Sequence, residues 1–281
     1  MSNLIFGSRR LKEHLTSNNI EDWKFHPTSS THNDLPKGIF IKNLIVAGSP
    51  WLGAQDQSEK YIAEFIRCIE YICKNNEVEK LIYVSSAAVY GLVTVNKLPL
   101  SEDAKLAGKS KYASEKIKCE KICQQLFDTE RLKTLFILRP AGFYGTLDNS
   151  QKPVNFLDRL QRAFASKNAE KFTLDFSGQQ QRDFCSYSDF IQVIKDLLDL
   201  NVSGDFKFNL KSTSAENIIN VALQFVSRSQ LEMRESHDEK IHSVLSCQSL
   251  QNFLNFNKKD LPQYDLNVVI QKIKSNCIGK L

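Results

Sequence analysis

The chain has 281 residues, of which 42% are hydrophobic and 25% charged, as in an ordinary globular protein. This length suits one large domain, or a core with a smaller lobe. The formal net charge of +5 is small and scattered, which argues against a nucleic-acid-binding protein. No apolar run approaches the roughly 18 residues that a membrane helix requires.

Seven cysteines are present, an odd number, without the close pairs that hold metals. Cys119 and Cys123 lie four residues apart on an expected helix, where packing is the simpler interpretation. The first residues have a strand pattern and lack a secretory apolar region. We therefore expect a reduced, cytoplasmic protein without a structural metal.

Apolar strand patterns alternate with amphipathic helix patterns through the first half of the chain. The expected strands are Leu4–Phe6, Trp23–His26, Ile39–Val46, Lys80–Val84 and Thr134–Leu138, and the expected helices are Arg9–Thr16, Ser58–Asn75 and Lys111–Phe127. This alternation predicts an α/β fold, a doubly wound parallel sheet with helices on both faces.

After Gly145 the alternation breaks down. The expected helices are Val154–Ala165 and Asp189–Leu200, the expected strands are Phe172–Phe176 and Phe206–Leu210, and the remainder is polar and helix-rich. We expect residues 1–150, completed by residues from about 180 to 210, to form the core, with 151–179 and 211–281 in a small lobe.

Three side chains form a candidate proton-transfer site. Ser86 follows an expected strand, in the run Val84-Ser85-Ser86-Ala87-Ala88-Val89-Tyr90-Gly91, and Tyr112 precedes Lys116 by one helical turn. A tyrosine phenol ordinarily has a pKa of about 10, and a neighbouring ammonium favours its ionised form. Tyr112 would move the proton, Lys116 would tune it and Ser86 would orient the substrate oxygen.

These two segments resemble the extended short-chain dehydrogenase/reductase family, in its NAD-dependent epimerase/dehydratase, sugar-nucleotide branch. The segments Leu138–Gly145, Pro153–Leu157 and Gly178–Phe184 are similar to further family segments. The resemblance implies a Rossmann-like core and hydride transfer between a nicotinamide and a sugar nucleotide. The reaction it implies is that of a 4-epimerase or a 4-keto reductase.

The resemblance also implies roles for individual residues. The cofactor-binding candidates are Gly7, Arg9, Arg10, Ala47, Gly48, Ser85, Tyr112, Lys116 and Pro140, and the substrate-binding candidates are Ser86, Asn155 and Arg182. Arginine suits a diphosphate because its planar fork pairs with two oxygens. The alternative for Arg182 is an ion pair with Asp183 or Asp189. The resemblance also allows a homodimer formed by the two long helices, Ser58–Asn75 and Lys111–Phe127.

The chain departs from the family at its start. Of the expected Gly-x-x-Gly-x-x-Gly turn only Gly7 is present, and the acidic residue expected after the second strand is missing near His26–Ser30. Either Arg9 or Arg10 holds the 2′-phosphate of NADP, which we favour over NAD, or dinucleotide binding is weakened and the protein is a non-catalytic scaffold. A reductase of another small carbonyl is a third hypothesis.

Two alanines bear on the reaction. The family's 4,6-dehydratases carry Asp-Glu directly after the catalytic hydroxyl residue, and this chain has Ala87 and Ala88 there. Because methyl groups cannot exchange protons, we expect no dehydration. Gly142 stands where epimerases usually have an asparagine, which leaves the choice between epimerase and reductase open.

Overall fold

A computed structural model describes residues 2–16, 23–48, 55–91, 93–145, 155–166, 171–175, 178–234, 242–259, 261 and 265–278. The chain divides into two compact units. The first unit comprises Met1–Val89, Leu106–Arg139 and Ile191–Phe208, and the second comprises Tyr90–Lys105, Pro140–Phe190 and Asn209–Leu281.

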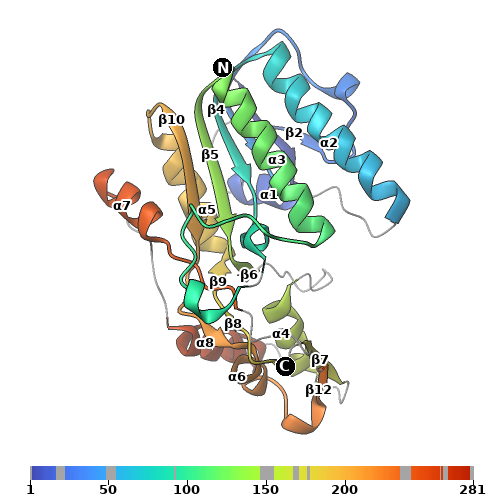
Figure 1. The fold of residues 1–281 in the computed structure, drawn as a ribbon, viewed down its shortest axis with the longest axis vertical. Coiled ribbons are helices and arrows are strands. Elements are labelled where there is room, and N and C mark those ends of the chain that lie inside the picture. Colours follow the sequence, from blue (N-terminus) through green and yellow to red (C-terminus); the bar gives the residue numbers. More distant parts are fainter. Residues whose placement is uncertain are drawn as a thin grey trace. The chain divides into compact units, whose positions relative to one another are not determined.

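The first unit is built on a six-stranded sheet (Figure 1). Its strands are β1 (Ser2–Gly7), β2 (Trp23–Pro27), β3 (Phe40–Val46), β4 (Glu77–Val84), β5 (Leu132–Pro140) and β10 (Gly204–Leu210), in the order β10-β5-β4-β3-β1-β2. The neighbouring pairs from β2 to β5 are all parallel. The predicted strands are therefore confirmed, with ends that differ by a few residues.

Helices lie on both faces of this sheet, and they are α1 (Arg9–Thr16), α2 (Gln55–Asn75), α3 (Lys111–Asp128) and α5 (Tyr187–Asp199). Leu81 and Tyr83 of β4 join a buried apolar cluster with residues of α2 and α3, among them Cys119 and Cys123. Because side chains alternate along a strand, Lys80 points to the opposite face. There its Nζ donates to the carbonyl oxygens of Leu197 and Leu198, at the end of α5. The doubly wound arrangement is thus confirmed.

The strand order reverses direction between β1 and β3. The chain goes from β1 to β2 on one side, and then returns to β3 on the other side of β1. The carboxyl ends of β1 and β3, at Gly7 and Val46, border this switch point, which is where open α/β sheets bind ligands.

The second unit contains short strands in three pairs, of which the sequence pattern predicts only β7, expected as Phe172–Phe176. These are β6 (Gly142–Tyr144) with β9 (Phe184–Ser186), β7 (Phe172–Asp175) with β12 (Leu231–Arg234), and β8 (Gln181–Arg182) with β11 (Glu216–Asn217). Its helices are α4 (Phe156–Ser166), α6 (Ile218–Leu223), α7 (Gln248–Phe256) and α8 (Leu266–Ile278). None of the helices in the described ranges is long and apolar enough to cross a membrane.

Candidate functional site

Two glycines shape the carboxyl edge of the sheet at the switch point. Gly7 has φ +115°, and a Cβ atom on it would lie 1.8 Å from the carbonyl oxygen of Ala47. Ala47 donates its N–H to Phe6 O at 3.0 Å, and Gly48 has φ +110°. Only glycine tolerates the combination of positive φ and close backbone approach at Gly7, which lets the ends of β1 and β3 meet, and Gly48 adds a second positive φ at this place.

Helix α1 begins immediately after this edge. Ser8 caps it, because its Oγ accepts a hydrogen bond from Leu11 N at 3.2 Å. The first turn of α1 thereby places the positive end of a helix dipole at the carboxyl end of β1. Arg9 and Arg10 open the helix, and their side chains lie outside the described part of the structure.

Lys116 is buried at the same edge, with 2% of its surface exposed. Its Nζ donates to Gly48 O at 2.7 Å and to Val84 O at 2.9 Å, which fixes α3 to the ends of β3 and β4. The Nζ also lies 5.7 Å from the centre of the Tyr112 ring. The ammonium and the phenol ring thus lie together on one face of α3, as the Tyr-x-x-x-Lys spacing predicts.

Ser86 follows β4 and leads into the short helix η2 (Ala87–Tyr90). Its Oγ accepts a hydrogen bond from Ala88 N at 3.2 Å, and its carbonyl oxygen accepts one from Val89 N. The hydroxyl proton of Ser86 is not used in this contact, so it can be donated to a ligand.

The loop that carries Ser86 is tied to the start of α3. Ala107 N and Gly108 N both donate to the carbonyl oxygen of Val89, at 3.0 and 2.9 Å. Ser110 then caps α3, because its Oγ accepts a hydrogen bond from Ala113 N at 3.1 Å. Tyr112, in the first turn of α3, is 36% exposed, so its ring can meet a ligand.

A buried ion pair supports these residues, and sequence reasoning missed it. Glu120 receives two hydrogen bonds from Arg139, Nε at 3.0 Å and Nη2 at 2.7 Å, and a third from Ser85 Oγ at 2.5 Å. The side chains of Glu120 and Arg139 are 5% and 3% exposed. Ser85, a predicted cofactor contact, thus directs its hydroxyl to Glu120. The available signal was the place of Glu120, one turn after Lys116.

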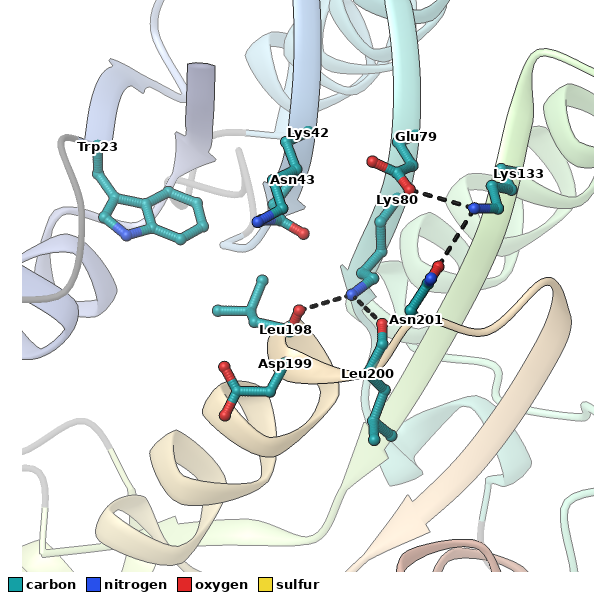
Figure 2. A pocket seen from close by; sticks show the side chains of 10 residues that line it. All are labelled: Trp23, Lys42, Asn43, Glu79, Lys80, Lys133, Leu198, Asp199, Leu200 and Asn201. Atoms are coloured by element: carbon teal, nitrogen blue, oxygen red, sulfur yellow. Dashed lines mark hydrogen bonds and ion pairs between the residues drawn. The ribbon is translucent and has the colours of Figure 1, made fainter. Parts of the chain in front are cut away.

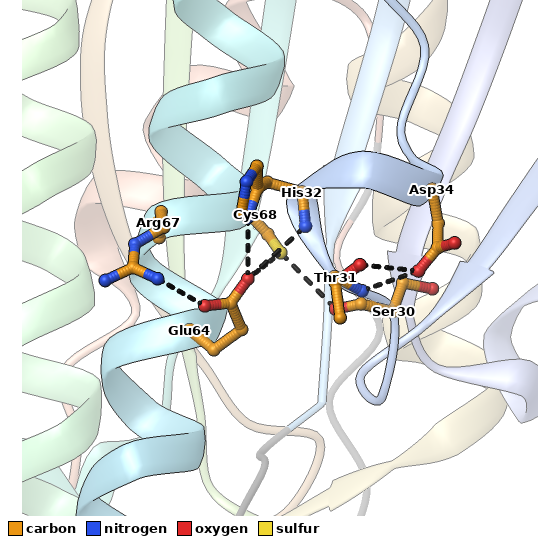
Figure 3. A network of polar contacts seen from close by, with 7 residues as sticks. All are labelled: Ser30, Thr31, His32, Asp34, Glu64, Arg67 and Cys68. Carbon is orange, nitrogen blue, oxygen red and sulfur yellow. Dashed lines mark hydrogen bonds and ion pairs between the residues drawn. The ribbon is translucent and has the colours of Figure 1, made fainter.

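A second network holds the segment that follows β2 against α2 (Figure 3). Glu64 accepts hydrogen bonds from the backbone N–H of His32 at 3.3 Å and from Arg67 at 2.8 Å, and its Oε1 lies 3.2 Å from His32 Nδ1. The thiol of Cys68 donates to Ser30 O at 3.4 Å. The pKa of Glu64 is lowered, chiefly by His32, while burial raises the pKa of Cys68 to about 12. This thiol is therefore a packing group.

Arg182 lies in the second unit, in the short strand β8. Its Nε and Nη2 donate to Gln180 Oε1 at 3.0 and 2.6 Å. Asp183, one of the expected ion-pair partners of Arg182, forms its salt bridge with Lys211 at 3.1 Å. Burial raises the pKa of Asp183, and Lys211 opposes that shift. The role of Arg182 toward a diphosphate stays a prediction.

The other predicted residues of this unit have structural contacts. Asn155 caps α4, because its Oδ1 accepts Asp158 N at 2.9 Å and its Nδ2 donates to Asp158 Oδ2 at 2.6 Å. Pro140 ends β5, and the next residue, Ala141, donates to Leu210 O. Of the predicted residues, Gly7, Ala47, Gly48, Ser85, Ser86, Tyr112 and Lys116 all belong to the first unit. The described residues contain no group of three metal-ligating side chains.

The sequence profile of the NAD dependent epimerase/dehydratase family matches residues 52–210, more than half of the chain. The chain belongs to this family. The matched segment of this epimerase/dehydratase protein contains Ser86, Tyr112 and Lys116, but it begins after Gly7 and Gly48. A search of curated proteins found no match.

Solved structures with low sequence identity share the epimerase/dehydratase fold. RMD from Pseudomonas aeruginosa, complexed with NADPH, is 18% identical, with 100% of this chain and 99% of that chain covered and a TM-score of 0.71. UDP-glucuronic acid 4-epimerase from Bacillus cereus, in complex with UDP-glucuronic acid and NAD, is 16% identical over 100% of both chains, with a TM-score of 0.73. dTDP-glucose 4,6-dehydratase from Bacillus anthracis, in complex with NAD, is 14% identical over 99% and 96%, with a TM-score of 0.70.

Proposed function

We propose that this protein is an NAD(P)-dependent oxidoreductase or isomerase of a nucleotide-activated sugar, acting as a 4-epimerase or a 4-keto reductase. The observation that carries the proposal is the position of Lys116. Its buried ammonium lies at the carboxyl ends of β3 and β4, one helical turn from the Tyr112 ring. Burying an ammonium is costly unless it has hydrogen-bond partners, and an apolar side chain at this position would need none of them.

The described residues fit a dinucleotide at the switch point. The N-terminus of α1 and the glycine pair Gly7 and Gly48 border the place where a pyrophosphate binds in such sheets. Lys116 holds two backbone carbonyls there, and its ammonium can exchange one of them for a ribose hydroxyl. When bound, the nicotinamide accepts or supplies the hydride.

The chain's own residues transfer the proton and orient the sugar oxygen. Tyr112 exchanges a proton with the C4 oxygen of the sugar, as that carbon becomes a carbonyl or returns to an alcohol. The positive charge of Lys116 stabilises the negative charge that develops on the phenol oxygen. Ser86 donates its free hydroxyl proton to the same sugar oxygen, which holds it in place.

Two sequence features narrow the reaction and the cofactor. Ala87 and Ala88 follow Ser86 and supply no acid or base, which favours epimerisation or reduction over dehydration. The segment after β2 has no acidic residue between His26 and Ser30 to repel a 2′-phosphate, which favours NADP(H) over NAD(H). Arg182 and Asn155 are the proposed contacts to the nucleotide diphosphate.

A second candidate function rests on the start of the chain. Helix α1 begins at Arg9, with Arg10 where the family's second glycine is expected, and the family profile matches only from residue 52. A non-catalytic member that binds a nucleotide or a protein partner would tolerate these changes. This scaffold would keep the fold and show no turnover.

Turnover assays separate the two functions. The protein is incubated with UDP-, dTDP-, GDP- and CDP-sugars and each of the four nicotinamide cofactors, and the products are separated by chromatography. We expect conversion of one sugar nucleotide, and a loss of about a hundredfold or more in Tyr112→Phe, because the phenol proton is removed. Tyr71→Phe, on α2, is the matched control and should keep full turnover. Turnover of Tyr112→Phe within about tenfold of wild type, or 1.4 kcal/mol in barrier, would contradict the assigned role.

A further inference from the structure

A pocket of about 550 Å³ lies at the other edge of the same sheet, near the amino ends of β3, β4 and β5 (Figure 2). Trp23 and Asn43 form one side of it, and the last residues of α5, Leu198 and Asp199, form another. Gly7, Gly48 and Lys116 lie at the opposite ends of these strands. The pocket is therefore separate from the proposed cofactor edge.

A polar row crosses the sheet beneath this pocket. The strand registers align Trp23 with Asn3, Asn3 with Asn43, Asn43 with Lys80, and Lys80 with Thr134. All five residues are buried, with exposed fractions between 1 and 6%. Aligned residues of parallel strands share a face, so five polar side chains meet in a layer that is elsewhere apolar. Because buried polar groups are normally hydrogen-bonded, each side chain of this row needs a hydrogen-bond partner in the protein or in a ligand.

Two atoms of the row have no hydrogen-bond partner within the described ranges. They are the indole Nε1 of Trp23, a donor, and the amide Oδ1 of Asn43, an acceptor. The other amide atom, Asn43 Nδ2, donates to Asn3 Oδ1 at 2.9 Å. A buried donor and a buried acceptor without partners are unfavourable, and both belong to residues that line the pocket.

The charges around the pocket favour an anion. Lys80 Nζ donates to three carbonyls at the end of α5, and Lys133 contacts Glu79 and Asn201, both at 3.3 Å. Lys42 has no partner among the residues that the structure describes. Three lysines thus face two carboxylates, those of Glu79 and Asp199.

The pKa of Lys80 is lowered to about 8, chiefly by burial. The positive charges of Lys42 and Lys133 contribute to the lowering, whereas the carboxylates of Glu79 and Asp199 oppose it. An anion in the pocket would reduce this repulsion, which is stronger in a partly desolvated site.

We propose that this pocket binds a small organic anion that also carries a hydroxyl or N–H group. Its carboxylate or phosphate pairs with the ammonium of Lys42, and an oxygen of the ligand accepts the N–H of Trp23. Its hydroxyl or N–H donates to Asn43 Oδ1. Trp23 Nε1 and Asn43 Oδ1 are themselves buried. Small side-chain rotations of Trp23 and Asn43 therefore accompany binding, because they bring these two atoms into contact with the ligand.

Calorimetric titration of the full chain tests the proposal, with glycerol 3-phosphate and malate as probes and glycerol as the uncharged control. Trp51→Phe leaves Trp23 as the single tryptophan, so its fluorescence reports binding at this wall. We expect one of the two anions to bind and to change this fluorescence. Lys42→Gln should weaken binding about tenfold, a change of 1.4 kcal/mol.

Lys24→Gln, at an exposed position of β2 outside the pocket, is the matched control and should bind like wild type. Trp23→Phe keeps an aromatic ring but removes the N–H, and should also weaken binding. The proposal is overturned if neither anion binds, if glycerol binds equally well, or if Lys42→Gln binds unchanged. An equal loss in Lys42→Gln and Lys24→Gln would show only general attraction by positive charge, and would also overturn it.

Discussion

Glu120 contacts the side chains of both Ser85 and Arg139, so it joins α3 to the strands that end beside Ser86. The pair is almost completely buried, and its charges are compensated by each other. A buried pair need not stabilise the fold, but removing one partner leaves an uncompensated charge in a low-dielectric environment.

Glu120→Gln should therefore lower the free energy of unfolding by about 3 kcal/mol, as measured by urea titration. The matched control is Glu232→Gln, because Glu232 pairs with Lys171 at 2.8 Å while both side chains are about half exposed or more. Such exposed pairs contribute at most about 1 kcal/mol. Equal effects of the two substitutions would show that burial does not determine the contribution of Glu120.

Asp189, in the first turn of α5, gives a prediction on pH. Its pKa is raised, mainly by burial, and its Oδ2 has no hydrogen-bond partner among the described residues. The unfolded carboxyl titrates near 3.8, below the folded one. The folded state therefore binds more protons between the two values, and stability falls as the pH rises through this window.

Asp189→Asn removes that fall, because the amide cannot ionise. We expect the variant to match wild type at pH 3.5 and to be more stable at pH 7, by a few tenths to about 1 kcal/mol. Chemical denaturation at both pH values measures the difference. A variant less stable than wild type at pH 7 would show that the charged form is favoured at this position.

At the scale of elements, Gly108 controls how the loop before α3 packs. A Cβ on Gly108 would lie 2.3 Å from Ala88 O and 2.5 Å from Ala113 Cβ, and a carbonyl oxygen cannot rotate away as a flexible side chain can. Gly108→Ala should lower stability by about 1–3 kcal/mol through overpacking. It should also reduce turnover, because Tyr112 and the Ser86 loop meet at this contact.

Gly142→Ala is the control for this substitution. Its Cβ would meet no atom closer than Phe184 Cδ1 at 3.9 Å, and its φ is not positive. Thermal denaturation of both variants compares the two sites directly. A loss of stability in Gly142→Ala as large as that in Gly108→Ala would show that backbone entropy, rather than the contact with Ala88, sets the effect.

The long elements could be predicted because each has its own pattern. Periodic apolar residues identified α2, α3 and α5, and runs of β-forming residues identified the sheet. The short strands of the second unit have two to four residues and are defined by their partners, as when Arg182 pairs with Glu216. Apart from β7, which was expected as Phe172–Phe176, these strands have no pattern of their own, so the sequence could not predict them.

The candidate site was predictable in part for the same reason. Tyr112 and Lys116 lie one turn apart on one helix, so their proximity follows from local geometry. The contact of Lys116 with Gly48 and that of Glu120 with Arg139 join residues far apart in the chain. They depend on how α3 docks on the sheet, which spacing alone does not encode.

For the whole molecule, the departure at the start of the chain determines which function holds. The sheet is Rossmann-like, with a switch point between β1 and β3, yet Gly7 is followed directly by a serine-capped helix. The same sheet has glycines and Lys116 at its carboxyl edge and a polar row at its amino edge. Ligand binding at both ends of the strands can be measured without knowing the sugar substrate.

Fluorescence titration with NADPH and NADH tests the central claim, that the buried Lys116 belongs to a nicotinamide site. We expect wild type to bind at least one of them and Lys116→Met to bind it about tenfold or more weakly, through loss of a charged hydrogen bond. Lys118→Met, exposed on the same helix, should bind like wild type, and circular dichroism checks that each variant is folded. Wild type that binds neither cofactor, or Lys116→Met that binds as tightly as wild type, would contradict the claim.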